Sequence, residues 1–295
     1  MSSVATRHKL IKKIKDQKFD EEKLQRYVLL TQIGSKDFQV AAVDSDDNRL
    51  IFFEDYVFSE VSTPSELREA LQSLFDSHEY LLAGFWKEVR VSTKNNKFIQ
   101  VPSALFIESA ADEYLKFNAV LEREKESVQA CRNKKTDAVT IFAIQNDMLE
   151  WLKGVYANST LRLLHQSTAL IEGVLACADT GNNPPLYVYI DRFKLHILFI
   201  KERRLIYYNQ FIIKQFSEYV KYIMLVMKAM GMDQSTSRVV LWGYIGRNSS
   251  HYQEFIKYVR NVSFGERPTH LKFGYLFDEV QEHHYFDLYS LNLLP

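Results

Sequence analysis

The chain has 295 residues, of which 46% are hydrophobic and 25% are charged, values that exclude an intrinsically disordered protein. Its 37 basic and 37 acidic side chains balance, so no overall field draws it to nucleic acid or to an anionic membrane. Two cysteines, Cys131 and Cys177, are too few for a disulfide framework or a structural zinc site.

The first 22 residues are rich in lysine. Lys9, Lys12, Lys13, Lys15 and Lys18 surround Leu10, Ile11 and Ile14. This spacing is compatible with a short basic amphipathic helix that contacts a partner or a membrane. A loosely attached, solvated arm is the interpretation that we favour.

Three strands joined by two short turns form the next predicted unit, a β-meander. The strands are expected at 27–32, 37–43 and 49–57, with turns at 34–36 and 44–48. Thr63-Pro64-Ser65-Glu66 then combines an N-cap, a proline at the first helical position and a capping-box glutamate. A helix therefore begins there.

The segment between the first meander and residue 138 is interpreted as an insertion at about 79–135. It contains a predicted hairpin over 79–101 that turns at Asn95-Asn96, and a charged helical stretch through 122–126. A regular pattern follows, with strands at 138–144 and 160–165 and helices at 147–156 and 167–178.

The second half repeats the meander and its helix. Strands are predicted at 186–190, 195–201 and 204–211, followed by a helix that Gly231 terminates. A buried strand at 238–244, a helix that Ser250 and Gln253 can cap, and a last strand at 270–275 complete it.

These elements predict an α/β protein of two similar domains. The prediction divides the chain into a basic arm (1–22), a first domain with its insertion (23–180) and a second domain (181–295), with the hinge at Gly181–Pro185. The longest apolar stretches, such as 222–230, are far shorter than the ~20 residues of a membrane span. We expect a cytoplasmic protein.

Several motifs give the chain a family resemblance. The stretch from Ala138–Ile144 through Leu161–His165 and Leu170–Glu172 is similar to the pilus assembly actin-like proteins. The whole chain resembles a bacterial family, known mainly from Bacteroidetes, for which no activity is established. The motifs that carry this second likeness are Phe52–Tyr56, Val101–Phe106, Trp242–Ile245 and Arg267–Phe273.

The resemblance implies the actin-like ATPase fold, which is ribonuclease H-like, with two duplicated meander-helix domains around a cleft. In that fold the first turn of each meander holds phosphates, an acidic residue organises Mg²⁺, and a paired-glycine turn admits adenosine. The implied positions here are Gly34, Ser35 and Lys36 in the first turn, Asp191 and Lys194 in the second, and Gly243 in the third.

The residues depart from that pattern at each turn. Gln32 stands where the acidic residue is expected, Arg192 and Phe193 replace glycine in the second turn, and Tyr244 replaces the second glycine of the third. A neutral amide is a poor partner for hydrated Mg²⁺, and bulky side chains hinder the close approach of a phosphate. Ordinary turn roles for Gly34, Asp191 and Gly243, and solvated lysines at 36 and 194, remain open alternatives.

The hypothesis from sequence is therefore a non-catalytic scaffold or partner-binding module with a degenerate nucleotide site and no cofactor. A protein partner is expected, and nucleic acid is not. The alternative is a nucleotide-binding switch or weak ATPase that uses ATP with Mg²⁺. His283, His284 and Asp287 are the densest group of potential metal ligands, but no further ligand is identifiable, so no metal site is predicted.

Overall fold

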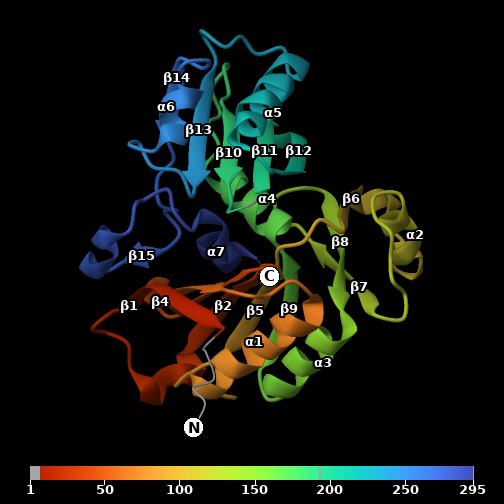
Figure 1. Cartoon of the computed structure of the whole chain (residues 1–295), viewed down its shortest axis with the longest axis vertical. Coiled ribbons are helices and arrows are strands. Elements are labelled where there is room, and N and C mark those ends of the chain that lie inside the picture. Colours follow the sequence, from red (N-terminus) through yellow and green to blue (C-terminus); the bar gives the residue numbers. More distant parts are fainter. Residues whose placement is uncertain (1–6, 193, 295) are drawn as a thin grey trace. The chain divides into compact units, whose positions relative to one another are not determined.

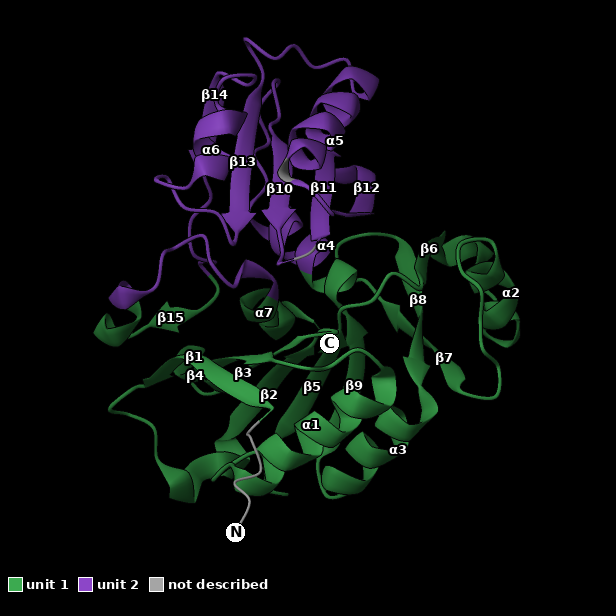
Figure 2. Cartoon of the chain, in the orientation of Figure 1, with its two compact units in different colours: residues 1–169, 270–277, 288–295 green, residues 170–269, 278–287 purple. Residues whose placement is uncertain are grey.

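The computed structural model describes residues 7–192 and 194–294 (Figure 1). The first six residues of the predicted arm lie outside the described residues, and so does Phe193, which stands where the family resemblance implies glycine. The described chain divides into two compact units (Figure 2). Unit 1 contains residues 1–169, 270–277 and 288–295, and unit 2 contains residues 170–269 and 278–287.

A mixed sheet forms the centre of unit 1. Its strand order is β1-β4-β3-β2-β5-β9, and β15 also pairs with β4. The strands are β1 (His8–Lys15), β2 (Tyr27–Ile33), β3 (Asp37–Asp44), β4 (Arg49–Phe58), β5 (Glu88–Thr93), β9 (Thr160–His165) and β15 (Lys272–Phe273). The antiparallel meander β2-β3-β4 is present as predicted, and β5 and β9 extend it in parallel on the β2 side.

Helices α1 (Pro64–Ser77) and α3 (Asn146–Val155) cover one face of this sheet, side by side (Figure 1). The predicted capping box is present at the start of α1, where Thr63 Oγ1 accepts from the backbone N of Glu66 and the Glu66 carboxylate accepts from the backbone N of Thr63. The apolar side of α1 is fully buried through Ala70, Leu71 and Leu74. The main core of unit 1 therefore lies between the two helices and the meander.

A smaller sheet in unit 1 has the order β6-β8-β7 and packs with helix α2. Its elements are β6 (Phe98–Pro102), β7 (Glu126–Arg132), β8 (Ala138–Gln145) and α2 (Ala111–Lys116). Short 3₁₀ helices occur at Glu21–Arg26, Ser103–Leu105, Glu108–Ala110, Tyr275–Glu279 and Leu291–Leu293.

The five-stranded sheet of unit 2 has the order β12-β11-β10-β13-β14. Its strands are β10 (Leu186–Ile190), β11 (Lys194–Lys201), β12 (Arg204–Ile212), β13 (Arg238–Gly243) and β14 (Asn261–Phe264). One face packs against α5 (Phe216–Ala229) and α6 (Ser250–Phe255), and the other against α4 (Gln166–Cys177) and α7 (Phe286–Ser290). The second meander is thus present as predicted.

Several predicted elements differ from the structure. The cap of α6 is Ser249, whose Oγ accepts from the backbone N of Tyr252, rather than Ser250, and the strand predicted at 270–275 is limited to Lys272–Phe273. Residues 8–15 form edge strand β1 rather than a helix or a solvated arm, because backbone pairing with β4 and burial of Ile14 hold them on the sheet. The hairpin predicted over 79–101 does not exist, since β5 joins the large sheet and β6 joins the small one. The stretch 122–126 is not a helix but leads directly into β7.

The predicted domain limits also differ from the observed units. The boundary between the two units lies between Ala169 and Leu170, inside α4, so the predicted hinge at 181–185 lies within unit 2. Strand β5, which the prediction assigned to an insertion, lies in the interior of the large sheet. Residues 270–277 and 288–295, predicted in the second domain, belong to unit 1 because β15 pairs with β4 and Tyr289 packs on Phe53.

Candidate functional site

The first turn of each meander has the same backbone geometry. In unit 1 the backbone N of Gly34 donates to the O of Asp37 at 2.9 Å, and in unit 2 the backbone N of Asp191 donates to the O of Lys194 at 2.9 Å. Gly34 and Asp191 are thus equivalent positions of two hairpins. The two turns that the sequence singled out are structural counterparts, each within its own unit.

The parallel strand beside each meander is followed by an equivalent backbone hydrogen bond in the two units. Directly after β5, the backbone N of Lys94 donates to the O of Ile33 at 2.9 Å. Directly after β13, the backbone N of Tyr244 donates to the O of Ile190 at 2.7 Å. Lys94 and Tyr244 therefore occupy matching places. The sequence analysis singled out the tyrosine but missed the lysine, which only its position after a parallel strand could have revealed.

A buried ion pair supports the first turn from beneath. The Nζ of Lys94 lies 2.8 Å from a carboxylate oxygen of Asp37, and the two side chains are 2% and 6% exposed. A Cβ atom on Gly34 would lie only 1.9 Å from the other Asp37 oxygen. Glycine is needed at position 34 because the carboxylate that binds Lys94 occupies the space of a side chain.

Ser35 and Lys36 form the exposed tip of this turn. The backbone O of Lys36 accepts from the N of Phe58 at 2.9 Å, which fixes the tip against β4. The ammonium group of Lys36 has no ion pair with any residue in 7–192 or 194–294. Lys36 therefore offers a positive charge at the surface.

Gln32, which replaces the expected acidic residue, is fully buried in β2. It pairs across the strands with Gln39 of β3 and Ser92 of β5. Neither its Nε2 nor its Oε1 has a hydrogen-bond partner among the residues that the structure describes. A carboxylate at this depth would need a compensating cation, whereas the neutral amide avoids that requirement at the cost of an unsatisfied polar group.

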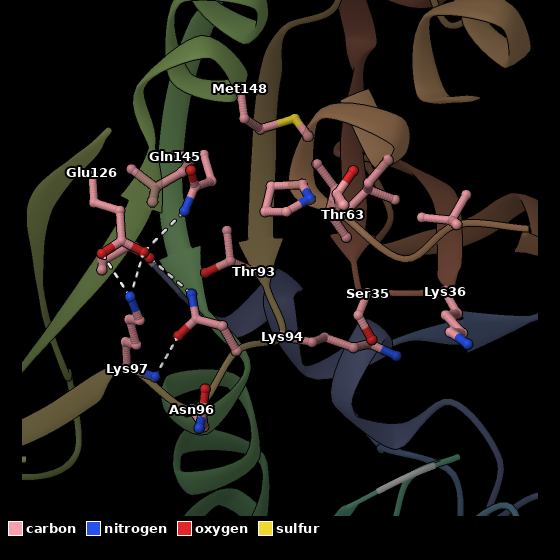
Figure 3. Close-up of a pocket in the computed structure, with 18 of the residues that line it drawn as sticks. Ser35, Lys36, Thr63, Thr93, Lys94, Asn96, Lys97, Glu126, Gln145 and Met148 are labelled. Atoms are coloured by element: carbon pink, nitrogen blue, oxygen red, sulfur yellow. Dashed lines mark hydrogen bonds and ion pairs between the residues drawn. The ribbon is translucent and has the colours of Figure 1, made fainter. Parts of the chain in front are cut away.

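A pocket of about 360 Å³ opens beside the first turn, within unit 1 (Figure 3). Its wall combines the turn at 33–36, the start of α1, the crossing segment 93–97 and the end of β8. Apolar side chains contribute Ile33, Val61, Pro64, Leu67, Ala143, Ile144 and Met148. Gly34, Ser35 and Lys36 line it, so three of the six predicted site residues share one cavity.

Polar groups at the far side of the pocket satisfy one another. Figure 3 shows Lys97, Glu126 and Gln145 pointing toward a common centre. The Nζ of Lys97 contacts both carboxylate oxygens of Glu126 at 2.7 Å, and the Nε2 of Gln145 donates to Glu126 at 2.9 Å. The backbone N of Glu122 also donates to this carboxylate. Sequence reasoning missed Lys97 and Glu126 because it treated 79–135 as separate from the core, and it missed Gln145 because only the pairing of β7 with β8 brings this residue to Glu126.

The start of α1 forms another part of the pocket wall. Glu66 accepts hydrogen bonds from the backbone N of Ser62 and of Thr63, and Thr63 Oγ1 accepts from Glu66 N. These bonds place a carboxylate at the helix N-terminus, where an anionic ligand would otherwise be favoured. The helix end therefore gives no vacant anion site.

The second turn lies in unit 2, beside a separate cavity of about 370 Å³. Asp191 lines this cavity, and its Oδ1 accepts from the backbone N of Arg192 at 2.8 Å. The guanidinium of Arg192 lies 4.5 Å from the ring centre of Tyr244. Burial and the charge of Asp191 raise the pKa of Tyr219 on the opposite wall. Lys194 begins β11 and closes the turn through its carbonyl oxygen.

Gly243 ends β13 with a φ of +94°, a conformation that favours glycine. A Cβ atom there would lie 2.0 Å from the carbonyl oxygen of Ile190 in the neighbouring strand. Its backbone N donates to the O of His283 at 2.8 Å. Packing of the two strand ends therefore suffices to explain this glycine.

The histidine cluster near the C-terminal end is engaged in packing. His283 Nε2 lies 2.6 Å from the carbonyl O of Ile245, and Asp287 accepts a 2.5 Å hydrogen bond from the buried hydroxyl of Tyr189. Across residues 7–192 and 194–294, no group of three or more His, Cys, Asp or Glu side chains could hold a metal ion. The described helices include none long and apolar enough to cross a bilayer.

Comparisons with known proteins identify the fold. The family described as "Protein of unknown function (DUF3822)" matches residues 16–262. A Bacteroides thetaiotaomicron protein with an actin-like ATPase fold and unknown function is 21% identical, with a TM-score of 0.77, over 94% of this chain and 99% of that chain. No curated protein matches the sequence.

A second solved structure supports the same fold. The PilM-PilN type IV pilus biogenesis complex is 11% identical, with a TM-score of 0.59, over 90% of this chain and 97% of that chain. The present chain therefore has the actin-like ATPase fold, and the resemblance to a Bacteroidetes family and to pilus assembly proteins is confirmed.

Proposed function

The chain belongs to the DUF3822 family, and we propose that it is a non-catalytic actin-like protein that binds a protein partner through the pocket of unit 1. The observation that carries the proposal is the charge pairing around that pocket. Lys94 and Lys97 are each bound to a carboxylate, Asp37 and Glu126. The charges of these two lysines are therefore already compensated, and a triphosphate in the pocket would meet the Glu126 carboxylate, so the lysines would balance its negative charge poorly.

The rest of the pocket suits a side chain from a protein. Its wall is mainly apolar, through residues such as Leu67, Ile144 and Met148, and the polar group of Lys97, Glu126 and Gln145 at its edge is already paired internally. An apolar anchor entering a preformed cavity is the usual centre of a protein interface. The similar fold of PilM, which is named as part of a complex with PilN, offers a precedent for partner binding by this architecture.

Thermal denaturation with nucleotide tests the non-catalytic part of the proposal. We expect no change in melting temperature when Mg-ATP is added at millimolar concentration, because a ligand that does not bind cannot shift unfolding. A rise of several degrees would contradict it. We also propose that the module works in the cytoplasm, where cysteines such as Cys131 and Cys177 stay reduced.

Photo-crosslinking tests the partner-binding part. A photoreactive amino acid at Ser35, which is exposed and lines the pocket, should yield a discrete crosslinked protein in cells. The product should be lost when Met148→Glu places a charge in the pocket. The same photoreactive group at the exposed Lys153, on the outer side of α3, is the matched control. Equal products at both positions would contradict the proposal.

A nucleotide-binding switch or weak ATPase is the second candidate. The observation in its favour is that both turns keep the same hydrogen-bonded form and that Asp191 lines a cavity in unit 2. If this candidate is right, purified protein hydrolyses ATP, and Asp191→Ala abolishes the turnover. Turnover that Asp191→Ala leaves unchanged would exclude the assignment of Asp191.

A further inference from the structure

The surface of helix α5 in unit 2 carries a groove of about 710 Å³. One wall is the exposed side of α5, and the other is the segment 232–235 that follows the helix. The groove shares no residue with the pocket of unit 1. An inference about it is therefore independent of the proposed function.

Helical geometry gathers an apolar and cationic stripe on this wall. Lys221, Leu225 and Lys228 are spaced i, i+4 and i+7, so they share one face of the helix. Leu225 is 57% exposed, whereas Ile223 and Met227 on the inner side are almost fully buried. The helix thus has a large apolar side chain on the face that does not contact the core.

Two methionine side chains add apolar surface to the groove beside Leu225. Met224 and Met232 line the groove and are only partly buried against the unit 2 core. Methionine adapts its shape to different partners because its side chain is unbranched and polarisable. Met227, by contrast, is 1% exposed and belongs to the core.

The opposite wall is held in place by backbone hydrogen bonds. Gly231 adopts a φ of +68°, and the backbone N of Met232 then donates to the O of Met227 at 2.8 Å. The Oδ1 of Asp233 accepts from the backbone N of Ser235 at 2.8 Å and of Thr236 at 3.0 Å. The groove is thus a preformed feature between a helix and a fixed turn.

Charge determines what the groove can accept. Neither Lys221 nor Lys228 forms an ion pair with a residue that the structure describes. The Asp233 carboxylate is engaged by its own turn, and that hydrogen bonding lowers its pKa. Two cations therefore flank an apolar centre, at a separation of ~10 Å along the helix axis.

We propose that this groove binds an acidic amphipathic helix of a partner protein, with an apolar side chain over Leu225 and acidic residues opposite Lys221 and Lys228. Two turns of a partner helix span the same ~10 Å, so acidic residues seven positions apart match the lysines. An added strand would need an open sheet edge, which α5 does not offer. A bilayer is flat, whereas this surface is concave with a polar rim at 233–235.

A designed peptide tests the proposal on the full chain. The probe is an alanine-based helical peptide with two glutamates seven residues apart and leucine and methionine between them on the same face. We expect it to bind with an affinity that falls at least about ten-fold in the Lys221→Glu/Lys228→Glu variant and falls in Leu225→Ala. Fluorescence anisotropy at two salt concentrations measures both effects, and added salt should weaken binding.

Matched controls separate this site from general electrostatics. The double variant Lys201→Glu/Lys257→Glu reverses the same number of exposed charges elsewhere in unit 2 and should leave the affinity unchanged. Melting temperatures of all variants check that the fold is intact, as expected for exposed positions. Absence of peptide binding, equal loss in the control variant, or lysine-dependent binding to phosphatidylserine vesicles without peptide binding would each overturn the proposal.

Discussion

Gly34 and Gly243 are fixed by atoms that lie beside their α-carbons. At Gly34 the neighbour is a carboxylate of a buried ion pair, and at Gly243 it is a backbone carbonyl of the next strand. Asp37 is only three residues from Gly34, but the ion pair that fixes its carboxylate comes from the distant Lys94, and Ile190 reaches Gly243 through the parallel pairing of β10 with β13, so no local sequence pattern reveals either constraint. The same glycines that resemble phosphate or adenosine contacts thus have sufficient structural reasons.

Substitution of Gly34 tests this interpretation. In Gly34→Ala the new methyl group displaces the Asp37 carboxylate from Lys94, and we expect a loss of about 1–3 kcal/mol in the free energy of unfolding. Urea denaturation without nucleotide measures it. The control is Gly154→Ala in α3, where nothing lies within 4 Å, and a gain of up to about 1 kcal/mol is expected. Equal stability of the two variants would contradict the role assigned to Gly34.

Protonation of His284 is expected to make the free energy of unfolding of unit 2 depend on pH, in a direction that follows from the pKa shift. Burial, and then the neighbouring His283, lower the pKa of His284 from 6.5 to about 4. The unfolded chain therefore binds the proton first as pH falls, and stability is lost between about pH 6.5 and pH 4, by on the order of 1–3 kcal/mol. His284→Gln should flatten the slope of unfolding free energy over that interval.

The matched control is His251→Gln, at an exposed position of α6. His8, His270 and His283 also have lowered pKa values, mainly through burial, so His284→Gln should reduce the slope without removing it. A slope that stays the same in His284→Gln, or that falls equally in His251→Gln, would exclude the assignment.

Besides its backbone pairing with β4, strand β1 is linked to the rest of unit 1 by one buried carboxylate. Glu54 of β4 lies 2.9 Å from the Nζ of Lys13, 2.6 Å from the Nε2 of His78 and 2.6 Å from the hydroxyl of Tyr56. Its side chain is fully buried. Three donors from β1, β4 and the end of α1 thus share two carboxylate oxygens.

Glu54→Gln should loosen this junction. A glutamine has one acceptor oxygen, so at least one of the three donors would face the amide NH₂ group. We expect a loss of about 2 kcal/mol or more in unfolding free energy, and faster amide hydrogen exchange in 8–15. Glu69→Gln, which removes an exposed ion pair with Arg7, should change stability by less than about 0.5 kcal/mol. Unchanged exchange in 8–15 would show that Glu54 does not hold β1.

The sequence predicts best those strands that pair with the next strand along the chain. The antiparallel meanders are connected by short turns, so alternation and turn residues are enough to locate them. In β1 the alternation fails because the register shifts between Leu10 and Lys12, which leaves Ile11 as an extra residue. The resulting spacing of apolar residues imitates a helix. The Asn95-Asn96 turn likewise imitates a hairpin, although the chain there crosses between two sheets.

The candidate site was predictable only in part. The turns at Gly34 and Asp191 could be located because their hairpins are local. Glu126, Gln145 and Met148 could not, because they reach the pocket only when β8, which pairs with its neighbour β7, also pairs with the distant β6. Their contribution depends on strand order, which no single segment encodes.

At the scale of the whole molecule, unit 1 is discontinuous in sequence. Its last segment, 288–294, packs on the sheet through Tyr289 against Phe53, with ring centres 6.3 Å apart. The Nη1 of Arg90 donates to the carbonyl oxygens of Leu291 and Asn292 at 2.9 and 3.0 Å. Unit 1 therefore depends on residues that follow unit 2 in the chain.

Deletion of residues 288–295 should destabilise unit 1 selectively. It removes the buried leucines at 288, 291 and 294 together with Tyr289, a loss of at least about 3 kcal/mol. Hydrogen exchange should accelerate in β2 and β4, while β10 and β13 retain their protection. Equal acceleration in both sheets, or none in β2 and β4, would contradict the division into units.

Because unit 1 is discontinuous in sequence, its folding cannot be completed until unit 2 has been synthesised. The ribosome delivers residues 1–169 first, yet Phe53 and Arg90 receive their partners only after the intervening chain has been made. Elongation across that stretch takes on the order of ten seconds. During this interval the nascent sheet exposes a face that is later covered, so we expect chaperone contacts to concentrate there. An mRNA truncated within codons 270–287 would yield a chain that contains the main strands of unit 1. That chain would lack the C-terminal segment that packs on the large sheet of this unit.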